Sequence, residues 1–396
     1  MPDGEKAVTV SVAGSIHEIP AADWDACAGA DNPFLSHAFF AALEDSRSAC
    51  PETGWLPRHL VVNGDDGRAV GCAPLYLKSH SYGEYVFDWG WADAFNQAGG
   101  RYYPKLQAAV PFTPVSGRRF LLRADAPAGT DRALAMAMVD LARRLRVSSL
   151  HVTFLTGEES RLLAGLDLGF LPRIGHQFHW RNDGYRCFDD FLGRLSSRKR
   201  KALRKERAAA TGHDVVIRTL TSDAIEARHW DAFHRFYVDT VDRKWAHAYL
   251  TRDFFFRLGE AMADKVVLII AETGAGRLVG GALNLVGADA LYGRYWGCAA
   301  DYRCLHFEAC YYRAIDYAID RGLARVEAGA QGAHKIQRGY LPVKTYSAHW
   351  IANAGFRSAV ARFLEAERPA VEAEMGALAA GSPFRRDDAD NADADC

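Results

Sequence analysis

Residues able to move protons and hold charge gather in one segment of the chain, VEAGAQGAHKIQRGYLP. Glu327 or His334 is suited to act as a general base, and Lys335 to stabilise a developing negative charge. An apolar strand that runs into such a loop places these groups at a sheet edge, where ligands of α/β proteins tend to bind. The alternative is an ordinary polar loop in which Glu327 forms a salt bridge. We expect three catalytic residues, Glu327, His334 and Lys335, and three substrate contacts, Gln331, Arg338 and Tyr340.

A strongly basic segment, RLSSRKRKALRKER, contains eight basic residues and one acidic residue. If it is helical, Arg198, Lys201 and Lys205 share one face at positions i, i+3 and i+7. Such a face can hold the phosphate groups of a nucleotide, a carrier or an RNA acceptor stem. A solvated helix face is the alternative, but the excess of positive charge is larger than solvation requires. The sequence therefore predicts phosphate binding by these three residues.

Two aromatic segments are candidates for lining a substrate cleft. The first, GRYYPKLQAAVPFTP, carries tyrosines and a lysine on a backbone stiffened by prolines, and its alternative is a packed surface loop. The second, DRKWAHAYLTRDFFFRL, has the composition of a helix core apart from its Lys-Trp pair. We predict substrate contacts at Tyr102, Tyr103, Lys105, Lys244 and Trp245, and at Trp296, which ends a predicted strand.

Signals for a metal or a nucleotide cofactor fail on their spacing. His306 and Glu308 form an HxE pair, but no PCxxC follows that would complete a zinc site. The glycines of ETGAGRLVGG do not match GxGxxG and lead into a strand, so this is not a dinucleotide fingerprint. No metal site and no resident cofactor are predicted.

The elements that must position these residues occur twice. The segment GRAVGCAPLYL at 67–77 matches GRLVGGALNLV at 276–286, and each follows an apolar run and a glycine-containing turn. Trp89 then aligns with Trp296, and an amphipathic helix and a further strand follow in each copy. Each copy is predicted to form strand, hairpin, strand, strand, helix and strand, which is a mixed-sheet α/β unit.

The two copies differ in what they carry. His151 stands in the first copy where Glu327 stands in the second, and the first copy lacks the polar loop, so we expect one reacting centre in the second copy. The first copy also has extra residues before its helix. The predicted organisation is a first domain at 1–181 with an insertion at 96–126, a second domain at 182–370, and a largely disordered acidic tail at 371–396.

Composition excludes several classes of protein. The 396 residues are 49% hydrophobic and 24% charged, which excludes a disordered chain. A net charge of −1 excludes coating of nucleic acid by bulk charge. No apolar run reaches the ~18–20 residues of a membrane span, and no signal peptide is recognised. The eight cysteines form no CxxC pair, which predicts reduced thiols in a cytoplasmic protein.

Five motifs taken together resemble the FemAB-like branch of the GNAT acyltransferase superfamily, and most closely the bacterial family labelled peptidoglycan biosynthesis/recognition. They are NPFLSHAFFAALEDS, YYPKLQAAVPFTPVSG, FDDFLGRLSSRKRKALRKER, RKWAHAYLTRDFF and EAGAQGAHKIQRGYLPVKTYSAHW, and they extend roughly over residues 30–365. The resemblance implies two tandem GNAT-like domains with a cleft between them. It also implies transfer of an acyl or aminoacyl group to an amine. In better understood FemAB-like enzymes the donor is an aminoacyl-tRNA and the acceptor a peptidoglycan precursor.

One departure from the superfamily bears on the donor. Members that use acetyl-CoA hold its pyrophosphate with a Q/RxxGxG/A loop, whereas the corresponding junction here reads AADYRCLHFEA, without glycine. Aminoacyl-tRNA and an acyl-CoA or carrier thioester are both candidate donors, so tRNA is a candidate partner. The expected function is N-acyl or aminoacyl transfer to a small-molecule or peptidoglycan-precursor amine. The alternative is an inactive recognition module that binds a wall precursor or a partner in the cleft.

Overall fold

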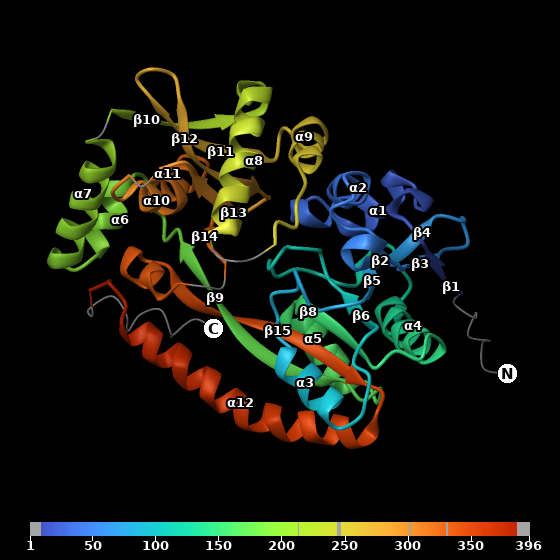
Figure 1. The fold of residues 1–396 in the computed structure, drawn as a ribbon. Coiled ribbons are helices and arrows are strands. Elements are labelled where there is room, and N and C mark those ends of the chain that lie inside the picture. The colour runs from blue at the N-terminus through green and yellow to red at the C-terminus, as the bar shows by residue number, and fades with distance from the viewer. Residues whose placement is uncertain (1–8, 213, 244–246, 301, 330–331, 386–396) are drawn as a thin grey trace. The chain divides into compact units, whose positions relative to one another are not determined.

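The computed structural model describes residues 9–212, 214–243, 247–300, 302–329 and 332–385 (Figure 1). Contacts divide the chain into two compact units. The first unit comprises Met1–Gly175 and Thr345–Val371, and the second comprises His176–Lys344 and Glu372–Cys396.

The first unit contains two sheets. One has the strand order β15–β8–β6–β5–β2, and in it β6 and β8 run parallel. The other has the order β1–β3–β4–β7 and is antiparallel. Leu134 and Met138 of helix α4 are fully buried against the strands, as their helical spacing predicts. The strands are β1 Val10–Ala13, β2 Trp55–Pro57, β3 His59–Asn63, β4 Ala69–Ala73, β5 Leu75–Lys78, β6 Lys105–Ala108, β7 Leu121–Leu122 and β8 Ser149–Leu155; the helices are α1 Ala21–Ala28, α2 His37–Asp45, α3 Trp89–Gln97, α4 Thr130–Arg144 and α5 Gly157–Gly165.

The second unit is built on one mixed sheet with helices on both faces. Its strand order is β10–β11–β12–β13–β14–β9, and β13–β14 is the parallel pair. Helix α8 approaches so closely that a Cβ on Gly297 of β13 would lie 2.1 Å from the carbonyl oxygen of Phe236. The strands are β10 Val215–Thr221, β11 Val266–Thr273, β12 Leu278–Val286, β13 Ala290–Cys298 and β14 Arg325–Glu327; the helices are α6 Phe188–Arg194, α7 Ser197–Thr211, α8 Ala227–Asp242, α9 Arg252–Ala261, α10 Leu305–Phe307 and α11 Arg313–Asp320.

The predicted duplication of a mixed α/β unit is confirmed. Strand β6, helix α4 and parallel strand β8 in the first unit follow the same order as β13, α10–α11 and β14 in the second. One detail of the alignment is wrong: Trp89 begins helix α3 and is not the strand counterpart of Trp296. Strand β6 takes that place, so the extra residues of the first copy lie on both sides of β6. The sequence does not reveal β6, because Lys105 and Gln107 give this short strand a polar pattern although all four of its residues are buried. The match between the two tryptophans therefore determines the predicted alignment.

Strands β9 and β15 each pair with the copy to which they do not belong in sequence. Strand β9 (Leu171–Arg181) follows the first copy but pairs through its second half with β14, and β15 (Leu341–Ile351) follows the second copy but pairs with β8. The first unit therefore includes Thr345–Val371, although residues up to 370 were predicted to belong to the second domain.

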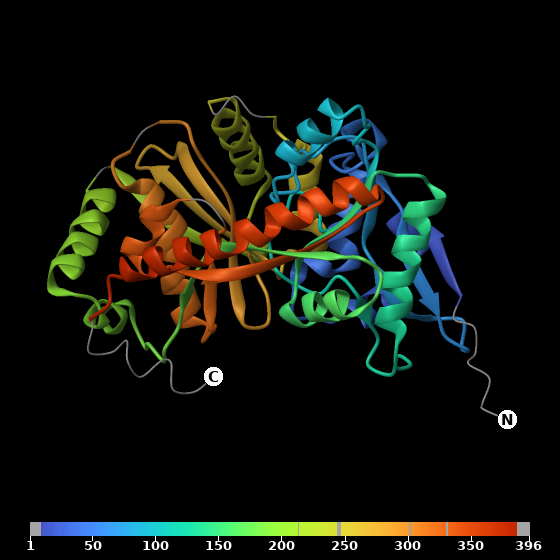
Figure 2. The same cartoon turned by 90° about the horizontal axis from the view of Figure 1, so that it is seen from below.

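The tail expected to be disordered from residue 371 is partly helical. Helix α12 (Ala354–Ala380) continues well past that point, and Phe384 bridges to Leu195. Its first turns pack beside α3, where Val360 and Leu364 are buried with Trp91 (Figure 2). Packing of one face stabilises an alanine- and glutamate-rich helix that looks too polar to fold alone. Residues 386–396 lie outside the described part. Among the described residues even α12 is not apolar enough to cross a membrane.

Candidate functional site

The candidate site in the second unit lies where β13 and β14 stop pairing. The parallel register ends at Tyr292 and Glu327, although β13 continues to Cys298. The chain leaving β14 reaches the short helix η6 (Ala333–Arg338), which carries most of the predicted site residues. Opposite it, residues Glu308–Tyr312 form a π-helical turn between α10 and α11. Such turns are rare and often occur at functional sites.

Glu327 is buried on β14 beside a basic neighbour. Its Oε1 accepts a 2.9 Å hydrogen bond from Nε of Arg325, and its Oε2 lies 3.6 Å from Nε2 of His179 without forming a hydrogen bond. Burial raises the pKa of Glu327, against the opposing effect of Arg325. Burial also lowers the pKa of His179 to about 3, so this imidazole is neutral. Glu327 therefore has one oxygen without a hydrogen bond, and it forms no hydrogen bond or ion pair with His334 or Lys335.

His334 is the exposed member of the predicted catalytic set. Its Nε2 lies 2.9 Å from the hydroxyl of Tyr311, which the π-helical turn presents. Its ring also packs against Phe307, with centroids 5.8 Å apart. Partial burial, followed by the charges of Arg338 and Lys335, lowers the pKa of His334 below its ordinary value. The side chain is thus neutral near pH 7, held in one orientation, and open to solvent.

Lys335 is directed inward. Its ammonium donates to the carbonyl oxygens of Ala328 and Gly329, the latter at 3.2 Å, and lies 5.6 Å from the ring centre of Phe178. Burial lowers its pKa to about 8. Two of its three hydrogens are used to hold the end of β14, so its predicted role in charge stabilisation rests on the third.

Arg338 and Tyr340 position the loop from within. Arg338 is buried, donates to both carboxylate oxygens of Glu206 at 2.9 Å and lies over the ring of Phe307 at 3.4 Å. Tyr340 is fully buried and donates to the carbonyl oxygen of Tyr311 at 3.1 Å. The prediction that these two side chains contact substrate is not supported, because both are buried and the Arg338 guanidinium and the Tyr340 hydroxyl donate to groups of the protein itself. The Arg338–Glu206 pair instead fastens η6 to α7.

The predicted basic helix exists as α7. Arg198, Lys201 and Lys205 are exposed on it, and within the described chain no carboxylate forms an ion pair with any of them. Two other arginines of α7 pair with carboxylates of the protein: Arg204 with Asp189 at the surface, and Arg207 with Glu308 and Asp316. The face of α7 that was predicted to bind phosphate is thus exposed and has no ion pair within the described chain.

Of the four remaining residues of this unit that were predicted to contact substrate, the structure describes one, Trp296. Trp296 is half-buried on β13 and packs against His306, with ring centroids 5.4 Å apart. Lys244, Trp245 and Gln331 lie outside the described residues. Among the described residues no group of three or more His, Cys, Asp and Glu side chains is placed to hold a metal ion.

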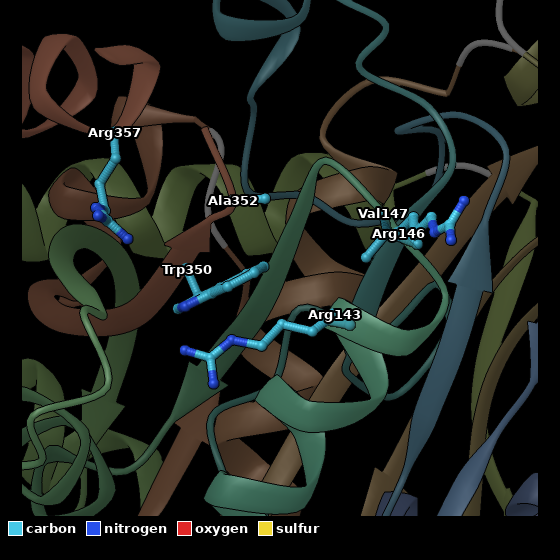
Figure 3. A pocket seen from close by; sticks show the side chains of 7 residues that line it. Arg143, Arg146, Val147, Trp350, Ala352 and Arg357 are labelled. Carbon is cyan, nitrogen blue, oxygen red and sulfur yellow. The ribbon is translucent and has the colours of Figure 1, made fainter. Parts of the chain in front are cut away.

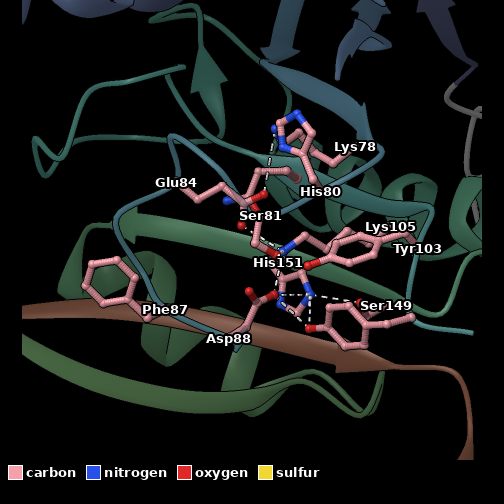
Figure 4. A network of polar contacts seen from close by, with 12 residues as sticks. Lys78, His80, Ser81, Glu84, Phe87, Asp88, Tyr103, Lys105, Ser149 and His151 are labelled. Carbon is pink, nitrogen blue, oxygen red and sulfur yellow. Dashed lines mark hydrogen bonds and ion pairs between the residues drawn. The ribbon is translucent and has the colours of Figure 1, made fainter. Parts of the chain in front are cut away.

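In the first unit, Tyr102, Tyr103 and Lys105 join a network of polar side chains. Figure 4 shows Lys105 and Tyr103 within it. Lys105 is 0% exposed, and its ammonium donates to Glu84 at 2.7 Å and to Asp88. Burial acts against the ammonium, but the two carboxylates outweigh it and raise the pKa of Lys105. The predicted ligand contact by Lys105 is therefore corrected to an internal role.

The tyrosines extend the network to neighbouring polar groups. Tyr102 is 1% exposed and donates to Asp88 at 2.7 Å, while the hydroxyl of the half-buried Tyr103 lies 2.8 Å from that of Ser81. Neither Tyr102 nor Lys105 is accessible to a ligand. Tyr103 alone keeps part of its surface open.

Two histidines continue the network across paired strands. His151 of β8 and His349 of β15 face each other in register, with their Nδ1 atoms 2.7 Å apart. Burial lowers the pKa of His151 to about 3 and that of His349 well below its ordinary value. Both rings are neutral, so one Nδ1 donates and the other accepts. His151, which stands in the first copy where Glu327 stands in the second, thus joins β8 to β15 through its contact with His349.

Sequence reasoning missed Tyr311, Glu84, Asp88 and His349. Tyr311 lies in the segment that the sequence predicts as the amphipathic helix of the second copy, and a π-helical turn has no recognisable sequence pattern. Glu84 and Asp88 lie in a polar segment far from Lys105 in sequence. An unpaired lysine between apolar residues, as in PKLQAAV, was the available signal of a buried charge.

Comparisons with known proteins bear on the whole chain. A model of the FemAB-like family, described as peptidoglycan biosynthesis/recognition, matches residues 15–386. A crystal structure of FemX is similar, with 12% identity, a TM-score of 0.52, and coverage of 88% of this chain and 98% of the other. The C-terminal domain of a putative lysylphosphatidylglycerol synthetase from Agrobacterium fabrum has 10% identity, a TM-score of 0.53 and coverage of 87% and 96%. L-PGS from Bacillus licheniformis has 10% identity, a TM-score of 0.50 and coverage of 85% and 98%. These structural likenesses establish the shared fold. A comparison with curated proteins gives no match.

Proposed function

Because this chain belongs to the FemAB-like family of peptidoglycan biosynthesis and recognition, we propose that it transfers an acyl or aminoacyl group to an amine of a cell-wall precursor. The observation that supports this activity is the state of His334. It is exposed, neutral and held by Tyr311, on a helical turn that Arg338 fastens to the basic helix α7.

The proposed chemistry needs a base because an alkyl ammonium acceptor, with a pKa of about 10.4, must lose a proton before it can attack. His334 accepts that proton. The amine nitrogen then forms a bond to the carbonyl carbon of the donor, and the ester or thioester bond of that carbon breaks. The leaving oxygen or sulfur takes up the proton that His334 holds, and the new amide nitrogen releases its extra proton to solvent. The third N–H of Lys335 supports the oxyanion formed between these steps.

The unpaired face of α7 favours a donor with several phosphates along a backbone. Arg198, Lys201 and Lys205 extend over two helical turns, and the junction before α10 lacks the glycine loop that holds the pyrophosphate of acetyl-CoA. An aminoacyl-tRNA therefore fits the proposal better than acyl-CoA. Transfer from it would take place in the cytoplasm, the compartment that the cysteine usage also favours.

A recognition module without catalysis is the second candidate. It is favoured by the internal engagement of two predicted catalytic groups: Glu327 pairs with Arg325, and Lys335 donates to two backbone carbonyls. Such a module would bind the precursor and turn nothing over.

The deciding experiment offers the protein radiolabelled aminoacyl-tRNA or acyl-CoA together with a peptidoglycan precursor that has a free side-chain amine. We expect label to move from tRNA to the precursor. The triple variant Arg198→Ala, Lys201→Ala, Lys205→Ala should raise KM for tRNA at least tenfold and reduce the salt slope of binding by about 3, or about 1 per lost phosphate contact. Arg204→Ala, which removes a paired arginine of the same helix, is the control. Precursor binding without transfer from either donor would establish the recognition module instead.

A further inference from the structure

The first unit has a basic pocket that the proposed transfer reaction does not use. It has a volume of about 420 Å³ and lies where α4 ends, β15 ends and α12 begins (Figure 3). Arg143, Arg146 and Arg357 line it together with Trp350. Within the described residues no carboxylate forms an ion pair with any of these three arginines. Three positive charges thus border one hollow without a counter-charge.

A buried donor in the same pocket also has no partner. Trp350 is 4% exposed, and its indole Nε1–H makes no hydrogen bond. Figure 3 shows the nitrogen-bearing edge of the indole directed to the side where the guanidinium groups of Arg143 and Arg357 lie. A buried donor without an acceptor costs about 1–3 kcal/mol, so an oxygen ligand at this place would remove an existing penalty.

The backbone supports the same conclusion. Helix α4 ends in a Schellman motif, in which Val147 N–H bonds the carbonyl of Ala142 and Arg146 N–H bonds that of Arg143. Glycine is the usual residue at the left-handed position of this motif, but here Arg146 occupies it with a φ of 51°. An arginine at a position that favours glycine is consistent with a use for its charge. The N-terminus of α12, adjacent to Ala352, adds the positive end of a helix dipole.

We infer that this pocket binds a phosphate or diphosphate group through Arg143, Arg357 and the indole N–H of Trp350, with Arg146 adding charge. A phosphate ester carries about −1.5 to −2 charge near pH 7 and several acceptor oxygens, which matches these donors. Trp350 has too little free ring surface to stack a nucleobase, so the phosphate is the recognised group. The phosphate can belong to a soluble ester or to a lipid headgroup, since Leu145 beside the arginines is 39% exposed and could enter a lipid surface.

The test uses the full chain and needs no transfer activity, so its result is independent of the proposed function. Inorganic pyrophosphate is titrated while the indole N–H resonance of Trp350, assigned with Trp350→Phe, is followed by NMR. We expect saturable binding and a shift of that resonance. Arg143→Gln and Arg357→Gln should each weaken binding at least tenfold. Arg132→Gln, an exposed arginine at the other end of α4, should leave it unchanged.

A second arm separates the two sources of phosphate. Vesicles of phosphatidylcholine with and without phosphatidylglycerol are tested by co-sedimentation, with Leu145→Ser as an added variant. Pyrophosphate binding without vesicle binding assigns a soluble phosphate ester. Vesicle binding that requires phosphatidylglycerol, Arg143 and Leu145 assigns a lipid headgroup. If neither probe binds, or if Arg143→Gln and Arg357→Gln bind as well as the unaltered chain while remaining folded by circular dichroism, the inference is wrong.

Discussion

At the scale of single residues, the chemical type of a side chain did not decide its role; its partners did. Lys105 and Lys335 are both buried lysines, yet Lys105 neutralises two carboxylates while Lys335 holds two carbonyl oxygens. His334 differs from both because it is exposed and oriented by one hydroxyl group. The accessible group is therefore the one suited to take a proton from a substrate.

Replacing Lys105 tests this distinction. Lys105→Met leaves the buried Asp88 without its lysine and leaves Glu84 only the more distant Lys78, whose Nζ is 3.9 Å away. Removal of one partner from a buried ion pair costs about 3–5 kcal/mol. We expect a loss of that size in the free energy of unfolding, measured by urea denaturation. Lys344→Met is the matched control, because the exposed pair of Lys344 with Glu372 is worth about 0–1 kcal/mol. Equal stability of Lys105→Met and the unaltered chain would show that the network is not structural.

At the scale of elements, β15 is held in the first unit by polar as well as apolar contacts. Ala348 and Trp350 enter the core, and His349 meets His151 of β8 in register. Since burial keeps both imidazoles neutral, the native state does not take up the protons that the unfolded chain binds below pH 6.5. The stabilisation from this pair is present above pH 6.5 and is lost as the pH falls toward the lowered native pKa values.

The size of this pH effect follows from linkage. At one pH unit below its unfolded pKa, each neutral histidine should lower the free energy of unfolding by about 1.4 kcal/mol. The pair should therefore lower it by about 3 kcal/mol between pH 7.5 and 5.5. The free energy of unfolding, measured by urea denaturation at both pH values, should fall less in the double variant His151→Gln, His349→Gln than in the unaltered chain. The difference between the two decreases should be about 3 kcal/mol. A double variant with the full pH dependence would mean that the pair is protonated in the native state.

At the scale of the whole molecule, the repeat was predictable and the exchange of strands was not. The hairpin matches at 67–77 and 276–286 became strands β4–β5 and β12 because the same turn and apolar pattern recur. The exposed basic face of α7 was also predictable from spacing. Strands β9 and β15 are each eleven residues long and buried toward their C-terminal ends, so the pattern gives burial but not the partner strand. The buried carboxylates of the first unit escaped prediction for the same reason, since partners distant in sequence decide them.

The pairing of β15 with β8 predicts which fragment of the chain folds on its own. Residues 1–175 alone lack β15, so β8 has an unpaired edge and the core lacks Trp350. A fusion of 1–175 to 345–371 restores both, and a short glycine-serine linker suffices because a Cβ on Gly175 would lie 3.1 Å from Oγ1 of Thr345. Hydrogen exchange should show protected β8 amides in the fusion and rapid exchange in 1–175. Equal protection in both fragments would mean that β15 is dispensable.

We propose that His334 takes the proton of the acceptor amine in a transfer reaction of the second unit. The most direct measurement is kcat/KM for aminoacyl transfer from tRNA as a function of pH, for the unaltered chain and for His334→Gln, with His17→Gln as the control. We expect an acidic limb below pH 6.5, where His334 becomes protonated. We also expect a loss of about 10²–10⁴-fold in kcat/KM at pH 7.5 in His334→Gln, the usual contribution of a general base. His17→Gln should keep both the rate and the limb. Transfer at the unaltered rate in His334→Gln, with the acidic limb intact, would contradict the claim.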